Sequence, residues 1–303
     1  MDSEKPVRQW TVLSLLAWTQ SYFQSHAIDS PRLTAEMLLC HCLGLERLDL
    51  YLQFDRPLNP GELAAYRALV ARRVRREPVA YITGTKGFWE LELDVTPDVL
   101  IPRPDTETLV EAALGVLAGK VGTGRLKVLE LGVGSGAVIL SLSRALAHAG
   151  IDWYATDLSL AAIRVAMANL RKNPGVPSVH FLAGSWFSAF KKGMYFDLVV
   201  SNPPYIPSAD INGLEPEILY EPRLALDGGP GGLDCIRQIV CSACDHMMPG
   251  AVMMLEMGFD QKNGVSDLVR QCGGYEPVEF LKDFSGHYRV AVLKKKIANT
   301  RAI

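Results

Sequence analysis

The spacing of apolar residues predicts that roughly the first 77 residues form helices. Apolar side chains recur at helical spacing between Ser30-Pro31, a typical helix start, and Gly44, a typical helix end. A second helix is predicted to begin at Asn59-Pro60 and to run to Glu77-Pro78. This helix is rich in arginine, with Arg67, Arg72, Arg73, Arg75 and Arg76. We interpret these arginines as a solvated helix face, with a docking patch for an acidic or RNA-containing partner as the alternative.

The apolar period changes to two over residues 88–95. Trp89, Leu91, Leu93 and Val95 alternate with mostly polar residues, which predicts a strand with one buried face. Residues 100–107 contain two prolines and are expected to be a rigid extended connector, with a helix beginning near Thr106.

Short apolar runs alternate with helical patterns beyond residue 125. The predicted strands lie at 128–131, 153–156, 179–182, 196–200, 251–255 and 288–293, with helices at 137–148 and 161–170 among them. Continuous apolar strands separated by helices predict an α/β fold, in which a mostly parallel sheet has helices on both faces. The expected organisation is a helical domain over 1–77, a hairpin or extended linker over 78–105, and an α/β domain over 106–303. Residues from 294 onward are expected to be frayed.

Composition restricts the class of protein. Lysine plus arginine total 31 and aspartate plus glutamate 33, so bulk positive charge does not hold this chain to nucleic acid. No apolar run is long enough for a membrane span, and the acidic start at residues 1–6 is unlike a secretory signal. We therefore expect a soluble, globular, cytoplasmic protein.

Six cysteines are too few for a disulfide scaffold in a chain of this length. Cys241 and Cys244 form a lone C-x-x-C, and Cys40 and Cys42 flank a histidine, but neither cluster supplies the four ligands of a zinc site. We interpret these cysteines as small core residues and expect no metal.

The first chemical signal is a glycine-rich turn between a predicted strand and a predicted helix. The turn consists of Gly132, Val133, Gly134, Ser135 and Gly136. Its glycines allow a close backbone approach to a ligand at a helix N-terminus. Asp157 ends the next predicted strand, where a carboxylate can accept both hydroxyls of a ribose. These residues predict a nucleoside cofactor, although the turn alone does not exclude NAD.

The second signal distinguishes between these cofactors. The predicted strand at 196–200 leads directly into Asn202, Pro203, Pro204 and Tyr205, at the same sheet edge as the glycine turn. The Asn202 side-chain oxygen and the Pro203 carbonyl can accept hydrogen bonds from the two N–H groups of a planar amide or amine. The prolines stiffen the backbone, and Tyr205 offers an aromatic wall. This arrangement suits methyl transfer to nitrogen and offers nothing for hydride transfer.

Together these motifs resemble a class I, Rossmann-like methyltransferase that uses S-adenosylmethionine. Further segments resemble the HemK/PrmC family of protein-(glutamine-N5) methyltransferases, which modify peptide chain release factors. They are EPVAYITG at 77–84, LIPRPDTE at 100–107, EPRLALDGG at 221–229, GLD at 232–234 and GHYR at 286–289.

The resemblance implies roles for particular residues. Residues 132–136, Asp157 and Asn202 would bind S-adenosylmethionine, with S-adenosylhomocysteine as product, and Trp186 would lie against the adenine. Residues 202–205 would hold the target glutamine of the release factor. Phe88, Arg103 and Thr106 would help close the pocket. Two positions depart from the family: Ser185 stands where aspartate is frequent, and Glu130 replaces another frequent aspartate.

The expected mechanism is direct transfer of the methyl group without an essential base, because no histidine, cysteine or glutamate adjoins Asn202 in sequence. One alternative is an N-methyltransferase acting on an exocyclic amine of RNA or DNA. Another is a noncatalytic adaptor that keeps the fold. The helical domain is expected to recognise the protein partner.

Overall fold

The computed structural model describes residues 9–122 and 124–297. The chain divides into two compact units. The first consists of residues up to Gly84 together with Pro216–Tyr220, and the second of Thr85–Glu215 and the residues from Glu221 onward. No helix in the described ranges is long and apolar enough to cross a membrane.

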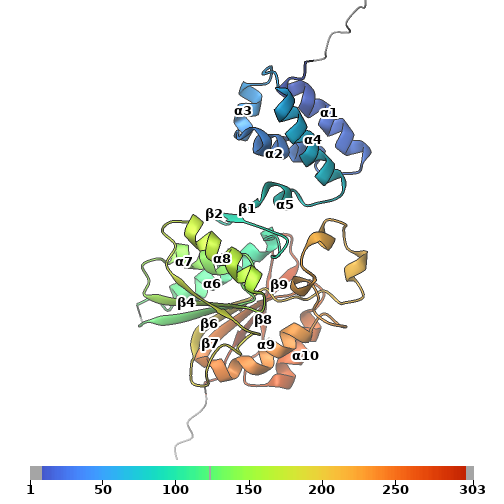
Figure 1. Ribbon diagram of the computed structural model, residues 1–303. Coiled ribbons are helices and arrows are strands. Elements are labelled where there is room, and N and C mark those ends of the chain that lie inside the picture. The colour runs from blue at the N-terminus through green and yellow to red at the C-terminus, as the bar shows by residue number, and fades with distance from the viewer. Residues whose placement is uncertain (1–8, 123, 298–303) are drawn as a thin grey trace, which may run out of the picture. The chain divides into compact units, whose positions relative to one another are not determined.

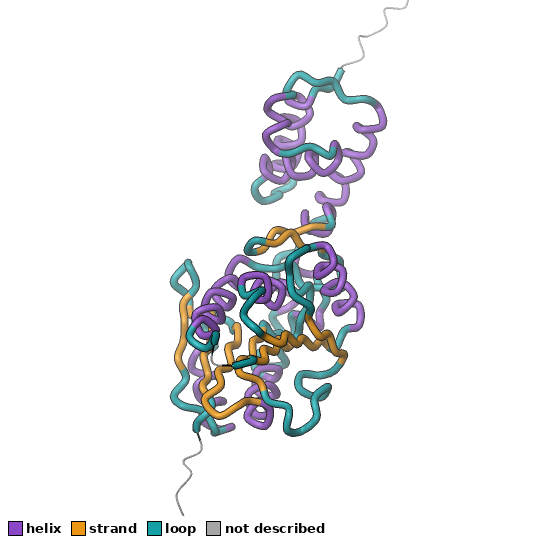
Figure 2. Tube along the Cα trace, turned by 90° about the vertical axis from the view of Figure 1, so that its left-hand side faces the viewer, coloured by secondary structure: helices purple, strands orange, loops and turns teal. Residues whose placement is uncertain are grey.

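The first unit is helical, as the apolar spacing predicted (Figures 1 and 2). Its helices are α1 (Val12–Ser25), α2 (Pro31–Leu43), α3 (Arg47–Leu52), α4 (Pro60–Val74) and α5 (Val79–Thr83). Both predicted helix starts are confirmed. At α4 the Asn59 side chain accepts a hydrogen bond from the Glu62 N–H at 2.9 Å, and the Glu62 carboxylate accepts one from the Asn59 N–H. Ser30 precedes α2 but its side chain makes no such bond.

The interpretation of the arginines on and just after α4 as a solvated face was wrong for Arg73. Its side chain is 5% exposed and pairs with Glu217 at 2.8 Å. Arg76 reaches the same Glu217 oxygen at 3.1 Å, and the Tyr220 hydroxyl donates to the Arg75 carbonyl at 2.6 Å. A segment far along the chain therefore completes the helical unit.

The second unit begins with a hairpin rather than a single strand. Strand β1 (Thr85–Phe88) pairs antiparallel with β2 (Leu91–Asp94). The predicted strand breaks at Trp89, which has a φ of 52° and is partly exposed. The buried Asn169 fixes the hairpin: its Oδ1 accepts from the Asp94 N–H, and its Nδ2 donates to the carbonyls of Asp94 and Ser135.

A seven-stranded sheet forms the centre of this unit (Figure 1). Its strands are β3 (Leu126–Leu131), β4 (Ile151–Asp157), β5 (Val179–Ala183), β6 (Phe196–Ser201), β7 (Met247–Glu256), β8 (Glu279–Lys282) and β9 (Tyr288–Lys294). They lie in the order β5-β4-β3-β6-β7-β9-β8, and only the pairings of β9 are antiparallel. The predicted α/β fold with a mostly parallel sheet is confirmed; only the edge strand β8 was missed.

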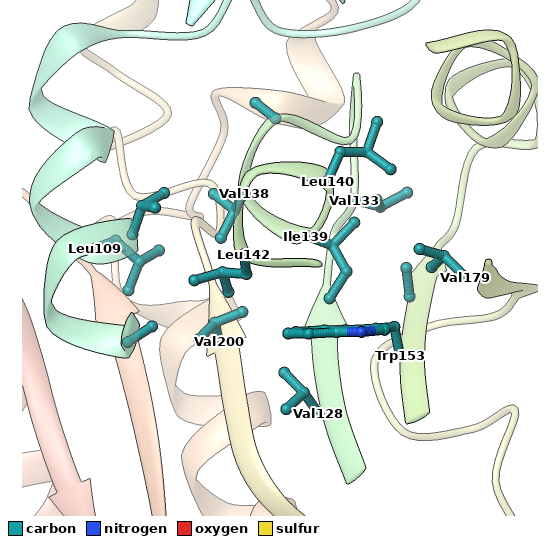
Figure 3. Close-up of a cluster of buried hydrophobic side chains, with 14 of the residues drawn as sticks. Leu109, Val128, Val133, Val138, Ile139, Leu140, Leu142, Trp153, Val179 and Val200 are labelled. Carbon is teal, nitrogen blue, oxygen red and sulfur yellow. The ribbon is translucent and has the colours of Figure 1, made fainter. Parts of the chain in front are cut away.

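Helices cover both faces of the sheet, as Figure 1 shows. One face carries α6 (Glu107–Ala118), α7 (Ala137–Ala145) and α8 (Leu160–Lys172), and the other carries α9 (Asp234–Ala243) and α10 (Lys262–Cys272). On the first face the fully buried Trp153 ring lies between Val128 and Ile139 (Figure 3). The sheet is thus buried on both sides, which accounts for its continuous apolar strands.

Two smaller predictions were wrong. Lys294 belongs to β9, and Lys295 donates to the carbonyls of Cys244 and Met247 at 2.6 and 2.7 Å, so these residues are not frayed. Cys241 is not a small core residue, because it is exposed and forms a disulfide with Cys272. Residues 1–6 and 298–303, on which the leader and tail predictions also rested, lie outside the described residues.

Candidate functional site

A cavity of about 300 Å³ opens at the carboxyl ends of β3, β4 and β6. Three of the predicted motifs line it: the glycine turn after β3, Asp157 at the end of β4 and Asn202 after β6. Parallel strands bring their carboxyl ends to one edge, which is why segments far apart in sequence meet here.

The glycine turn has the left-handed backbone that its sequence requires. The φ angles of Gly132, Gly134 and Gly136 are 72°, 52° and 87°, which residues with a side chain rarely adopt. The N–H of Gly132 is held by the Thr156 carbonyl at 2.8 Å. Apart from its two chain neighbours, no described residue has an atom within 4 Å of where a Cβ of Gly134 would be, so this side of the turn has room for a ligand.

Asp157 lies beside this turn. Its Oδ2 accepts a hydrogen bond from the Gly134 N–H at 2.9 Å, and its Oδ1 accepts one from the Ser159 N–H at 2.8 Å. Burial raises the pKa of the carboxyl above its usual value, while these backbone donors lower it. Asp157 therefore ties the turn to the end of β4 and presents a carboxylate to the cavity.

Glu130 lies beneath the turn and is 3% exposed. Its Oε2 accepts from the Ile139 N–H in the first turn of α7 at 2.8 Å. Burial raises the pKa of this carboxyl well above its usual range. Because it caps a backbone donor that begins α7, Glu130 supports the helix N-terminus on which the turn depends.

Trp186 and Ser185 line the cavity on the side of β5. Trp186 has a φ of 50°, and its indole N–H donates to the Gln238 Oε1 at 2.9 Å. The Thr156 hydroxyl donates to the Trp186 carbonyl at 3.2 Å. The ring is thus held at the cavity rim by contacts at both its backbone and its edge.

Asn202 also lines the cavity. Its Nδ2 donates to the Thr106 Oγ1 at 3.2 Å. This bond engages the nitrogen, so Oδ1 is the atom that Asn202 can offer as an acceptor.

Only part of the predicted tetrapeptide lines the cavity. Pro204 does, whereas Pro203 and Tyr205 are not among the described residues that line it. Tyr205 is instead held from behind: its hydroxyl donates to the Glu256 Oε1 at 3.2 Å, and its carbonyl accepts from the Gln261 Nε2 at 2.8 Å. The expectation that Tyr205 walls the pocket stays a prediction for the substrate-bound protein.

Two of the three residues expected to close the pocket line the cavity, and the third does not. Arg103 and Thr106 line the cavity, and Arg103 forms an ion pair with Glu221. Phe88 is 3% exposed and packs in the core with Leu91, so it does not close the pocket as expected. The strand pattern did not predict this burial either, because it placed Phe88 on the same face as Glu90 and Glu92.

Sequence reasoning missed the residues that support the site from behind. Glu221 accepts from the Ile101 N–H at 3.0 Å, and Gln238 and Gln261 hold Trp186 and Tyr205. Glu256 is the last residue of β7, and the rule that identified Asn202 at a strand end applies to it equally. The two glutamines lie on or just before helices, and nothing in their local sequence distinguishes them.

Comparisons with known proteins agree with this geometry. Residues 14–84 match the model of the PrmC N-terminal domain, and residues 110–227 match that of the methyltransferase small domain. The release factor glutamine methyltransferase of Geobacter sulfurreducens is 44% identical over 272 residues, which cover 89% of this chain and 92% of the relative. That of Rhodopirellula baltica is 34% identical over 289 residues, covering 94% and 97%.

The chain belongs to the release factor glutamine methyltransferase family. The resemblance deduced from the motifs is thereby confirmed. Among solved structures, the hMettl16 catalytic domain in complex with MAT2A 3'UTR hairpin 6 is similar, with a TM-score of 0.53 and 13% identity, covering 78% of this chain and 84% of that one. At that identity the likeness concerns the fold alone.

Proposed function

We propose that this protein transfers a methyl group from S-adenosylmethionine to the side-chain amide nitrogen, N5, of a glutamine in peptide chain release factors. The observation that carries the proposal is that Asn202 lines the same cavity as the glycine turn and Asp157. The names of its close relatives support the reaction and the substrate.

The cavity fits the cofactor. The open backbone at Gly134 provides room for the amino acid portion, Asp157 provides a carboxylate for the ribose hydroxyls, and Trp186 provides an aromatic face for the adenine. When bound, S-adenosylmethionine supplies a methyl group on a positively charged sulfur. Ser185 lines the cavity beside Trp186, and its hydroxyl replaces the carboxylate that is frequent in the family.

Asn202 and Pro203 hold the target amide in this proposal. The Asn202 Oδ1 and the Pro203 carbonyl each accept a hydrogen bond from one N–H group of the target amide, so that the amide nitrogen faces the methyl group. An amide nitrogen is a weak nucleophile because its lone pair is delocalised into the carbonyl. Positioning must therefore supply much of the rate, and oriented reactants gain about 7–11 kcal/mol in this way. No residue is required as a base, since the product amide cation is acidic enough to lose its proton without one.

The helical unit recognises the protein partner in this proposal. It exposes several large apolar side chains, which is typical of a protein-binding surface. They include Leu13, Trp18, Leu33, Met37, Leu48 and Phe54. A glutamine side chain alone offers too little contact for selection. The proposal places the reaction in the cytoplasm.

The decisive experiment is the intact mass of a purified release factor after incubation with the enzyme and S-adenosylmethionine, followed by peptide mapping. One added methyl group on a glutamine is expected from the wild-type protein. Asn202→Ala is expected to lose nearly all turnover while it still binds the cofactor. Methylation of purified RNA or DNA in place of the release factor, or wild-type turnover by Asn202→Ala, would contradict the proposal.

A further inference from the structure

A buried carboxyl group lies directly behind the residues that face the target amide. Glu256 is 1% exposed, and its Oε1 accepts from the Tyr205 hydroxyl at 3.2 Å. Its Oε2 has no partner at full hydrogen-bonding geometry among the described residues. Buried carboxyl oxygens are rarely left in this state, which indicates a function for Glu256 beyond packing.

A second contact relates Glu256 to Asn202. The Asn202 Nδ2 donates to the Thr106 Oγ1 at 3.2 Å, and Thr106 is 4% exposed. A threonine hydroxyl that accepts one hydrogen bond still has its own proton to donate. Thr106 lowers the pKa of the Glu256 carboxyl in the direction that a hydrogen-bond donor does, although no bond between the two meets full hydrogen-bonding geometry. Asn202 therefore donates to Thr106, and Thr106 keeps a proton that it can offer to the free Glu256 Oε2.

The direction of donation among these three groups decides which end of the Asn202 amide faces the target. An ionised Glu256 can only accept, so Thr106 donates to it and accepts from the Asn202 Nδ2, which leaves Oδ1 for the substrate. A protonated Glu256 can donate to Thr106. Thr106 then donates to Asn202, whose oxygen turns inward and whose NH2 group meets the substrate NH2 group. Two donors facing each other cannot hold the target amide.

We propose that Glu256 is a positioning residue for methyl transfer, which acts through Thr106 to keep the Asn202 oxygen turned toward the target amide. The inference rests on the proposed function and names a further residue for the same site. It assigns Glu256 no contact with the substrate, the cofactor or the transferred methyl group.

The charged groups around Glu256 determine when it is ionised. Burial raises its pKa to about 7, while Thr106, Arg289 and Tyr205 lower it and Asp105 raises it. Arg289, on the neighbouring strand β9, pairs with Asp105 at 3.0 Å and with Asp283 at 3.2 Å, so its charge is shared. Since the ionised form is the active one, turnover is expected to rise with pH through about pH 7.

The test compares steady-state methylation of a release factor by the wild-type protein and Glu256→Gln, with cofactor affinity measured by calorimetry. Glu256→Gln keeps the shape of the side chain but replaces a carboxylate, which only accepts hydrogen bonds, with an amide, which also donates them. We expect kcat to fall about ten- to hundredfold, the range for a hydrogen bond to a charged group. The cofactor Kd should stay within about threefold, and the rise of kcat through about pH 7 should disappear.

Thr106 provides a matched pair of variants if Glu256→Gln folds poorly. Thr106→Val keeps the size of the side chain and removes the hydroxyl, whereas Thr106→Ser keeps the hydroxyl. We expect Thr106→Ser to turn over at least about fivefold faster than Thr106→Val. A packing role predicts the reverse order, because valine fills the buried site better than serine.

A measurement without turnover completes the test. The infrared C=O band of a protonated carboxyl should titrate near pH 7 in the wild-type protein, and that titrating component should be absent from Glu256→Gln. If the wild type methylates the release factor and Glu256→Gln has the same kcat and pH profile, the inference about Glu256 is overturned and the proposed function stands. A wild-type protein that does not methylate the release factor would overturn the proposed function and this inference with it.

Discussion

Gly228 offers a sharp test of how closely the backbone around Asn202 must be held. A Cβ at Gly228 would lie 2.7 Å from the Gly232 carbonyl oxygen and 2.8 Å from the Tyr205 Cα. Both obstacles are backbone atoms, so no side-chain rotation can relieve them. Gly228→Ala therefore has to push apart the two loops that meet behind the site.

The size of the effect follows from these distances. Ordinary contact for a Cβ begins at 3.4 Å, so the Tyr205 backbone has to move by about 0.6 Å, the difference between 3.4 and 2.8 Å. Tyr205 is three residues from Asn202, and a misplacement of about 1 Å in an active site costs about a hundredfold in rate. We expect Gly228→Ala to lose about ten- to hundredfold in kcat, and about 1–3 kcal/mol in the free energy of unfolding from overpacking.

The assay is release factor methylation under steady state, with cofactor Kd by calorimetry and unfolding by denaturant. Gly231→Ala is the matched control, because Gly231 lies in the same loop, is exposed and has no described atom within 4 Å of a Cβ. It should behave as the wild type. If kcat of Gly228→Ala stays within about twofold of that of Gly231→Ala, the idea that this close approach positions Asn202 is refuted.

Three further predictions concern charged residues. Asp157→Ala should weaken cofactor binding about ten- to hundredfold in calorimetry, since it removes hydrogen bonds to a charged group; unchanged affinity would rule out its ribose role. Glu217→Ala should cost about 3–5 kcal/mol of unfolding free energy in denaturant, because it leaves the buried Arg73 unpaired. Asp267→Asn, in an exposed pair, should cost under about 1 kcal/mol and serves as control. Folding raises the pKa of Glu256 above its unfolded value, so the folded wild type holds that proton more tightly and loses stability as pH rises from about 5 to about 8. Glu256→Gln has no such proton to lose. The difference in unfolding free energy between this variant and the wild type should therefore change in favour of the variant by up to about 3 kcal/mol between about pH 5 and about pH 8. A difference that does not change with pH would contradict the assigned pKa.

Much of the fold was predictable because its signals are local. A strand buried on both faces is continuously apolar, and each such run beyond residue 125 became a strand of the sheet. The turn at Gly132 and the position of Asn202 were equally predictable, because strand direction alone brings them to one edge.

The rest depends on contacts that no local pattern contains. Arg73 looks like any surface arginine until Glu217, 144 residues later, meets it. The short edge strand β8 is only half-buried, so it lacks a continuous apolar run. Thr106 and Glu256 reach the site from two elements distant in sequence, and only the folded sheet places one behind the other.

The discontinuity of the helical unit restricts how this protein can be divided or recombined. A fragment that ends at Gly84 would contain α1 to α5 and yet leave the Arg73 guanidinium without its counter-ion. Exchanging the unit with that of a relative would likewise require exchanging Pro216–Tyr220 at the same time. The helical unit is therefore complete only together with a segment that the chain reaches after most of the sheet has been formed.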